Sequence, residues 1–226
     1  MKRADILKIA KPILFNTDMV RATLEDRKSV TRRVAKGITR EDDKSEYYNL
    51  FRKGEWTGLI HRDEVIATYA PYHKGDYLYV RETWSWCPCW DCGMVTEEHG
   101  CCDETASRIY NQTKREYGCY DYRASCEDNK FPNIDTWHPS IHMPKEAARI
   151  FLRVTDVRLE RLQYIDNKEA KLEGVTVETD NSGQMHRFAF YKLWDSTIPK
   201  KDLNKYGYKA NPWVWVIEFE RVEVKD

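Results

Sequence analysis

Apolar and polar positions alternate over several short stretches of the chain, and this period of two predicts β-strands. In residues 77–84, the alternation places Leu78, Val80, Glu82 and Trp84 on one face. The turn sequence at residues 74–76 precedes this strand. Strands are predicted over residues 29–34, 77–84, 149–154, 157–162 and 213–219.

Two stretches have helical spacing instead. Thr17 is suited to an N-cap, and Val20 and Leu24 then form one apolar stripe, which predicts a helix through about residue 26. A capping-box pattern at residues 166–169 starts a second short helix, which Gly174 ends. The chain therefore mixes short helices with short strands.

The length and composition are consistent with one hydrophobic core that carries insertions. The chain has 226 residues, of which 41% are hydrophobic and 13% aromatic, enough to fill a sizeable interior. We predict a single domain over residues 1–226, with an insertion at 37–70 and a cysteine-rich insertion at 85–136. Little chemistry is expected in the first insertion, because it is polar and poorly periodic.

A membrane location is not expected. No stretch approaches the roughly 18 consecutive apolar residues of a bilayer span. Three of the first five residues are charged, and the apolar run at 13–15 is interrupted at once by polar residues, so no secretory signal is visible. We expect the chain to be cytoplasmic.

Charge is unevenly distributed. The formal net charge is zero, so the molecule as a whole lacks the basic character typical of nucleic-acid-binding proteins. Residues 1–40, however, hold eleven Lys or Arg against four Asp or Glu, an excess of seven positive charges. This segment predicts a local basic surface; the alternative is an exposed cationic face balanced elsewhere.

Candidate functional residues lie in that segment. Along an extended strand Thr31 and Arg33 point to the same side, and Lys28 sits at the preceding corner, so the three can converge. Glu82 lies among apolar neighbours, so its carboxylate needs a positively charged partner, and Arg32 or Arg33 is a candidate. The alternative to a binding role for Glu82 is a structural ion pair.

Residues 26–33, Asp-Arg-Lys-Ser-Val-Thr-Arg-Arg, resemble the Gly-x-Lys-x-x-Glu-x-Arg signature of the ASCH family, a branch of the PUA-like β-barrels associated with RNA and modified nucleosides. Lys28 and Arg33 match it, Thr31 stands where many members have Glu, and Asp26 replaces the Gly. Asp tolerates the left-handed backbone that such a Gly adopts. The resemblance implies an α+β fold: a PUA-like (ASCH) open β-barrel with short flanking helices and two insertions.

The Thr variant is similar to the small bacterial ASCH enzymes that hydrolyse N(4)-acetylcytidine, whose third catalytic residue is a Glu after a short helix. By position this Glu resembles Glu173, so the resemblance implies Lys28, Thr31 and Glu173 as a catalytic set. Residues 12–34, 75–84 and 137–149 also resemble longer ASCH-domain proteins of bacteriophages and prophages. A bacterial or phage-infected bacterial cytoplasm is thereby implied.

Three functions stay open at this stage. The first is recognition of RNA or of a modified nucleobase or nucleotide, with Arg32, Arg33 and Glu82 as polar contacts and aromatic rings stacking on bases. Candidate rings are Trp84, Trp137, Trp213 and Trp215. The second is amide hydrolysis on an N(4)-acylated cytidine, which needs a nucleophile, a base and a proton donor. The third is a phage interaction protein that uses the fold as a scaffold.

The cysteines predict a metal site. Seven cysteines, an odd number, in a cytoplasmic chain argue against a disulfide framework. Cys89 and Cys92 form a Cys-x-x-Cys-Gly knuckle, and Cys101 and Cys102 follow, so four thiolates could surround one structural zinc. His99, Cys119 and Cys126 are alternative ligands, and a loop of free or buried thiols is the alternative to a metal site.

Overall fold

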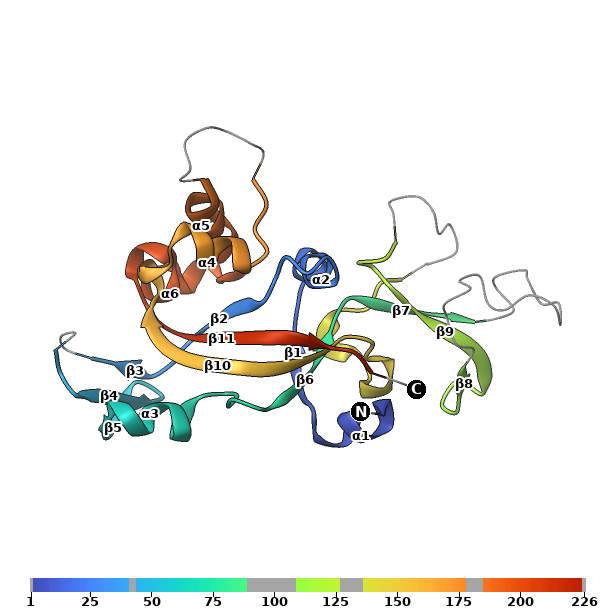
Figure 1. Ribbon diagram of the computed structural model, residues 1–226, viewed down its shortest axis with the longest axis horizontal. Helices are drawn as coiled ribbons and strands as arrows, with labels where there is room; N and C mark the ends of the chain where they lie inside the picture. Colours follow the sequence, from blue (N-terminus) through green and yellow to red (C-terminus); the bar gives the residue numbers. More distant parts are fainter. Residues whose placement is uncertain (1, 41–43, 89–108, 127–135, 178–184, 225–226) are drawn as a thin grey trace. The chain divides into compact units, whose positions relative to one another are not determined.

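The computed structural model describes residues 2–40, 44–88, 109–126, 136–177 and 185–224. These residues form a mixed α+β fold, which confirms the predicted class at that level (Figure 1). The helices are α1 (Arg3–Ile9), α2 (Thr17–Leu24), α3 (Arg62–Tyr69), α4 (Asn167–Leu172), α5 (Met185–Thr197) and α6 (Leu203–Tyr206). The strands are β1 (Lys11–Leu14), β2 (Val30–Val34), β3 (Ile38–Thr39), β4 (Tyr47–Arg52), β5 (Glu55–His61), β6 (Tyr77–Arg81), β7 (Trp84–Pro88), β8 (Ile109–Asn111), β9 (Glu116–Tyr122), β10 (Phe151–Arg161) and β11 (Trp213–Val222).

The strands belong to several sheets, and no closed barrel is formed by the part of the chain that the structure describes, so a PUA-like barrel is not confirmed. The chain divides into two compact units. The first unit comprises Met1–Arg21, Tyr79–Phe151 and Val224–Asp226, and the second comprises Ala22–Leu78 and Leu152–Glu223. Strands β6 and β10 each contribute residues to both units.

The second unit is built on β2, β11 and β10, which are consecutive in their sheet. β2 and β11 are antiparallel, with Thr31 opposite Ile217 and Arg32 opposite Val216. Figure 1 shows α4, α5 and α6 gathered near one end of β10 and β11. A hydrophobic cluster joins α4 and α5 to one sheet face and contains Val30, Leu162, Ile165, Ala170, Phe190, Trp194, Val214 and Val216.

Both faces of β11 are buried from Trp213 to Ile217. The predicted set Trp213, Trp215, Ile217 and Phe219 alternates with the cluster residues, and all four are at most 5% exposed. The strand is therefore covered on both sides, which is why its sequence reads as an almost continuous apolar run.

A second sheet in this unit is formed by the antiparallel strands β3, β4 and β5, followed by α3. It lies within the predicted insertion at 37–70. The turn between β4 and β5 places Lys53 and Gly54 at positive φ, 53° and 90°. At Gly37, also at positive φ, an added Cβ would lie 2.2 Å from the carbonyl oxygen of Phe51, so only glycine allows this close approach.

The first unit contains an antiparallel sheet in the order β7-β9-β8, built within the predicted insertion at 85–136. In this unit β1 neighbours the end of β6, and the Phe15 amide donates to the Arg81 carbonyl. Asn16, rather than the predicted Thr17, caps α2, because its side-chain oxygen accepts from the Met19 amide at 2.9 Å.

Two predicted strand boundaries need correction. The predicted strand 77–84 ends at Arg81, and Trp84 begins a different strand that pairs with β9. The two predicted pieces at 149–154 and 157–162 form one continuous strand, β10. In residues 77–84, Trp84 keeps the alternating positions of Leu78 and Val80, although the strand has already ended. In residues 149–162, the apolar positions change phase between Val154 and Val157, although the strand continues. The pattern therefore does not mark either boundary, and only strand pairing does.

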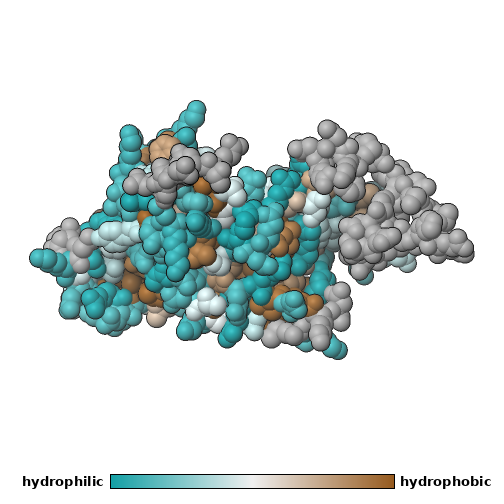
Figure 2. Space-filling model, turned by 45° about the horizontal axis from the view of Figure 1, so that its top comes forward, coloured by the Kyte–Doolittle hydropathy of each residue, from teal (hydrophilic) through white to brown (hydrophobic). Residues whose placement is uncertain are grey.

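The surface seen in Figure 2 is mainly hydrophilic, and the hydrophobic residues visible there lie in small separate areas. Within the described ranges, no helix has the length and apolar character that a bilayer span requires.

Candidate functional site

The corner between α2 and β2 holds Lys28 in the interior of the second unit. Asp26 adopts the expected left-handed conformation, with φ 55°, and the Lys28 amide donates to the Ala22 carbonyl at 3.0 Å. Gly174, at φ 85°, comes so close to this corner that an added Cβ would lie 2.6 Å from the Ala22 Cβ and 3.1 Å from the Lys28 Cβ. This close contact sets Glu173 beside Lys28, and the two residues form an isolated β-bridge.

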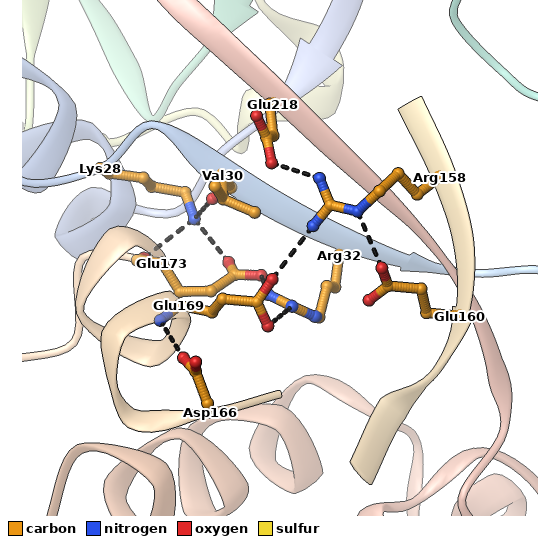
Figure 3. Close-up of polar contacts among 9 residues, drawn as sticks. All are labelled: Lys28, Val30, Arg32, Arg158, Glu160, Asp166, Glu169, Glu173 and Glu218. Carbon is orange, nitrogen blue, oxygen red and sulfur yellow. Dashed lines mark hydrogen bonds and ion pairs between the residues drawn. The ribbon is translucent and has the colours of Figure 1, made fainter. Parts of the chain in front are cut away.

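The Lys28 ammonium donates to three oxygens (Figure 3). Its Nζ lies 2.8 Å from Glu173 Oε2, 2.9 Å from the Glu173 carbonyl oxygen and 2.7 Å from the Val30 carbonyl oxygen. The Lys28 side chain is 0% exposed and that of Glu173 is 4% exposed. Burial lowers the pKa of Lys28, and the charge of Glu173 together with its hydrogen bond opposes this effect. An ammonium has three N–H donors, so these contacts match its full donor capacity.

An ion-pair network extends from Lys28 along α4 and the sheet. Arg32 donates through Nη1 to Glu173 Oε1 at 3.2 Å and through Nη2 to Glu169 Oε2 at 2.7 Å. Arg158 from β10 donates to the other oxygen of Glu169 at 3.0 Å. The network consists of Lys28, Arg32, Asp156, Arg158, Glu160, Glu169, Glu173 and Glu218, and Figure 3 draws all of these except Asp156. It ties β2, β10 and β11 to α4.

The first turn of α4 is fixed in the same region. Asp166 caps the helix by accepting from the Glu169 amide at 2.7 Å, which confirms the helix start predicted from the capping-box pattern. Gly174 ends the helix as predicted. Because both ends of α4 are set by local residues, Glu169 and Glu173 lie one turn apart, and Arg32 binds both of them.

Thr31 and Arg33 lie on the opposite face of β2 from Arg32, because side chains alternate along a strand. Thr31 is 1% exposed, and its hydroxyl has no hydrogen-bond partner among the described residues. Burial lowers the pKa of Arg33, while the charges of Glu173 and Tyr72 act in the other direction. The predicted contact of Lys28 with Glu173 is therefore present, whereas Thr31 is not hydrogen-bonded to Lys28.

The partner predicted for Glu82 is wrong. Glu82, 1% exposed, accepts two hydrogen bonds from Arg149, Nε to Oε1 and Nη2 to Oε2, each at 2.9 Å. The pair lies in the first unit, whereas Arg32 and Arg33 belong to the second and Arg32 binds the carboxylates of α4. The Arg149 guanidinium binds both carboxylate oxygens of Glu82, which is the bidentate geometry of a strong arginine–carboxylate pair.

The predicted stacking residues Trp84 and Trp137 also lie in the first unit. Trp84 packs between Tyr120 and His138, with ring centroids 5.6 and 4.9 Å away. The Arg123 guanidinium lies 5.7 Å from the Trp137 ring centroid. Both rings therefore have neighbours within their own unit that provide packing.

The second unit contains a cavity of about 830 Å³, which we call the basic cavity. It is bounded by β3, the β4–β5 turn, the end of β10, α6, and the start of β11. Its charged lining residues are Lys36, Arg52, Lys53, Arg161 and Lys205, and its aromatic lining residues are Phe51, Tyr206 and Trp213. None of the described residues that line it is acidic.

Trp213 forms an ordered wall of this cavity. The Arg161 guanidinium lies 4.5 Å and the Arg40 guanidinium 5.1 Å from its ring centroid, and Tyr48 contacts its edge with centroids 5.1 Å apart. Its indole nitrogen is buried without a hydrogen-bond partner in the described part of the chain. Arg161 is held in place by donating to the Asn211 carbonyl at 3.1 Å.

Sequence reasoning missed most of the basic cavity, because it expected little chemistry in the insertion at 37–70. The available signal was the turn at residues 53–54 with Phe51 and Arg52 directly before it. An aromatic ring beside a cation is the combination with which proteins stack on a base and contact its phosphate. Trp213 was singled out from the sequence, but its cationic neighbours were not.

A further group could hold a metal ion. The sulfur atoms of Cys87 and Cys119 and a carboxylate oxygen of Asp121 lie within 4.8 Å of one another in the first unit. The predicted ligands Cys89, Cys92, Cys101 and Cys102 lie outside the described residues.

Among the described residues we therefore distinguish three groups of polar side chains: the ion-pair network, the basic cavity, and the group of Cys87, Cys119 and Asp121. The first is saturated by its own partners, and the other two offer donor atoms and charges suited to ligands. In comparisons with known proteins, no family model, no curated protein and no solved structure matches the chain.

Proposed function

We propose that this protein binds RNA or a nucleotide, and that the basic cavity of the second unit receives a nucleotide unit. The observation that carries the proposal is the lining of the cavity, which combines five cationic side chains with three aromatic rings and has no acidic residue among those described. Phosphate and an aromatic base together match such a surface better than any simple anion.

The charges of the cavity support an anionic ligand. Lys36, Arg52, Lys53, Arg161 and Lys205 carry like charges, and none of the described lining residues is acidic. A phosphate supplies the opposite charge, and each cation–phosphate contact releases condensed counterions from a nucleic acid. The binding affinity should therefore depend strongly on salt concentration.

The size and rings of the cavity support a nucleotide within that class. A volume of about 830 Å³ falls in the range of small-molecule sites, roughly 300 to 1,000 Å³. Phe51 is 37% exposed, so its ring is accessible to a base. Stacking of a base on an aromatic side chain contributes on the order of 1 to 3 kcal/mol.

The ASCH-type, PUA-like fold is part of this proposal. Two features of the second unit support it: the left-handed Asp26 at the signature's Gly position, and the contact of Lys28 with Glu173, the pair that the resemblance implies. In this proposal the ion-pair network is a structural support that fixes β2 against α4.

Hydrolysis of an N(4)-acylated cytidine is the second candidate, favoured by the 2.8 Å contact between Lys28 and Glu173. A base must have an available lone pair and reach the nucleophile. Lys28 instead donates to three oxygens, and it makes no hydrogen bond to Thr31 in the described structure. The geometry therefore gives more support to binding than to catalysis.

The binding proposal is tested with a fluorescently labelled single-stranded RNA and with mononucleotides. We expect the variant Arg52→Ala/Lys205→Ala to bind RNA at least tenfold more weakly, and to lower the slope of log K against log salt by roughly 0.7 for each lost phosphate contact. The matched control is Lys209→Ala, an exposed lysine four residues after Lys205 that does not line the cavity.

Two results would contradict the proposal. One is the absence of RNA and nucleotide binding at micromolar protein; the other is an equal affinity in the double variant and the control. Comparable affinity for mononucleotides and RNA would identify a single-nucleotide site, and binding of RNA alone would identify a strand site. Incubation with N(4)-acetylcytidine, followed by mass spectrometry, tests the hydrolase candidate on the same preparation.

One structural zinc in the cysteine-rich insertion is also proposed, with Cys89, Cys92, Cys101 and Cys102 as its ligands. The support is their spacing, which places four thiols close together along the chain. Simultaneous substitution of Cys89 and Cys92 by serine should remove one zinc per chain, as measured by elemental analysis.

A further inference from the structure

We propose that Cys87, Cys119 and Asp121 bind a zinc ion on one face of the sheet formed by β7 and β9 in the first unit. Its ligands are different residues from the thiols of the Cys-x-x-Cys segment, and the proposal does not depend on nucleotide binding by the basic cavity.

The strand register brings the three donors together. Cys87 of β7 lies directly opposite Cys119 of β9, so their side chains project from the same face. Asp121 is two residues after Cys119 on the same strand and therefore shares that face. Ser85, opposite Asp121, donates to the Thr136 carbonyl at 3.0 Å and is occupied there.

The spacing of the donors suits zinc. Zinc bonds to thiolate sulfur at about 2.3 Å and to carboxylate oxygen at about 2.0 to 2.2 Å, so a tetrahedron places two donors roughly 3.3 to 3.8 Å apart. The three donor atoms already lie within 4.8 Å of one another. Small side-chain adjustments on two hydrogen-bonded strands would complete the arrangement, and the fourth position takes water or a further donor.

The kind of donor selects the metal class. Two sulfurs and one carboxylate favour zinc over magnesium and calcium, which take oxygen ligands. The thiols bind as thiolates, so each releases its proton to solvent when the metal enters. Cys119 is 4% exposed, whereas Cys87 and Asp121 are half-buried, so the group is accessible from one side.

The first test measures zinc per chain in the full-length protein, purified under reducing conditions and loaded with zinc. Cys119→Ser should lose one zinc equivalent, and Asp121→Asn should bind that equivalent at least tenfold more weakly. The matched control is Cys126→Ser, which changes another buried cysteine, 5% exposed, outside the group and should keep the full zinc content.

A second test uses the unaltered protein and does not depend on whether a variant folds. Iodoacetamide labelling with and without a chelator, followed by peptide mass spectrometry, should show Cys87 protected by zinc and reactive after chelation. The labelling of Cys126 should not change.

Three results would overturn the proposal. They are an unchanged zinc content in both Cys119→Ser and Asp121→Asn, labelling of Cys87 that is independent of the metal, and a disulfide between Cys87 and Cys119 in the zinc-loaded protein. Loss of all zinc in Cys89→Ser/Cys92→Ser, together with full zinc in Cys119→Ser, would assign the metal to the other thiols and likewise refute the site.

Discussion

Replacing Glu173 by glutamine removes the one negative charge that Lys28 and Arg32 share while preserving the shape of the side chain. Lys28 contacts Oε2 at 2.8 Å and Arg32 contacts Oε1 at 3.2 Å, and the side chains of both cations are at most 1% exposed. Arg32 keeps Glu169 as a partner at 2.7 Å. The Lys28 ammonium keeps the carbonyl oxygens of Val30 and residue 173 as acceptors, but these are neutral, and its side chain is 0% exposed to solvent.

The magnitude follows from this burial. Breaking a buried ion pair by removing one partner costs about 3 to 5 kcal/mol. Because glutamine retains one acceptor oxygen and Arg32 retains Glu169, we expect Glu173→Gln to lower the free energy of unfolding by about 3 kcal/mol, at the low end of that range. In urea this corresponds to a midpoint lower by on the order of 1 to 2 M.

The assay is urea unfolding followed by tryptophan fluorescence. Glu220→Gln is the matched control, because Glu220 pairs with Arg153 at 3.5 Å and both side chains are more than half exposed, so it should cost no more than about 1 kcal/mol. Lys28→Met combined with Glu173→Gln should lose less stability than the two single variants added together. A Glu173→Gln cost no larger than that of the control, or strict additivity in the double variant, would refute a structural role for the Lys28–Glu173 pair.

Three further changes test other parts of the structure. Thr31→Val removes a buried hydroxyl that has no partner among the described residues, so it should raise the free energy of unfolding by up to about 1 kcal/mol, as measured by urea unfolding. A lower free energy of unfolding in this variant would contradict the prediction. Gly174→Ala, at φ 85° and with its Cβ 2.6 Å from the Ala22 Cβ, should cost more than about 1 kcal/mol, measured in the same way. Burial raises the pKa of Tyr122 above that of an unfolded tyrosine, so its contribution to the free energy of unfolding is present below pH about 10 and is lost as pH rises further. Between pH 10 and 11, the Tyr122→Phe variant should therefore lose less stability than the parent protein, as measured by circular dichroism.

The local sequence determined the elements whose signals lie within a few residues. The capping box at Asp166 and the glycine at 174 define α4. Asp26 adopts the left-handed conformation that its place in the signature predicts. The last strand was predicted from the run beginning at Trp213. Capping, turn conformation and strand alternation depend on neighbouring residues, so they can be deduced from the chain without its tertiary structure.

The tertiary structure alone decided which charged groups meet. Glu82 pairs with Arg149, 67 residues away, whereas Arg32 or Arg33 was the candidate partner from the sequence. The basic cavity joins the β4–β5 turn to α6 and β11, segments far apart in the sequence. Attraction between charges has no sequence period, and any cation can satisfy a carboxylate that it reaches. The partners are therefore chosen by the packing of strands and helices, which brings certain cations within hydrogen-bonding distance and holds the others away.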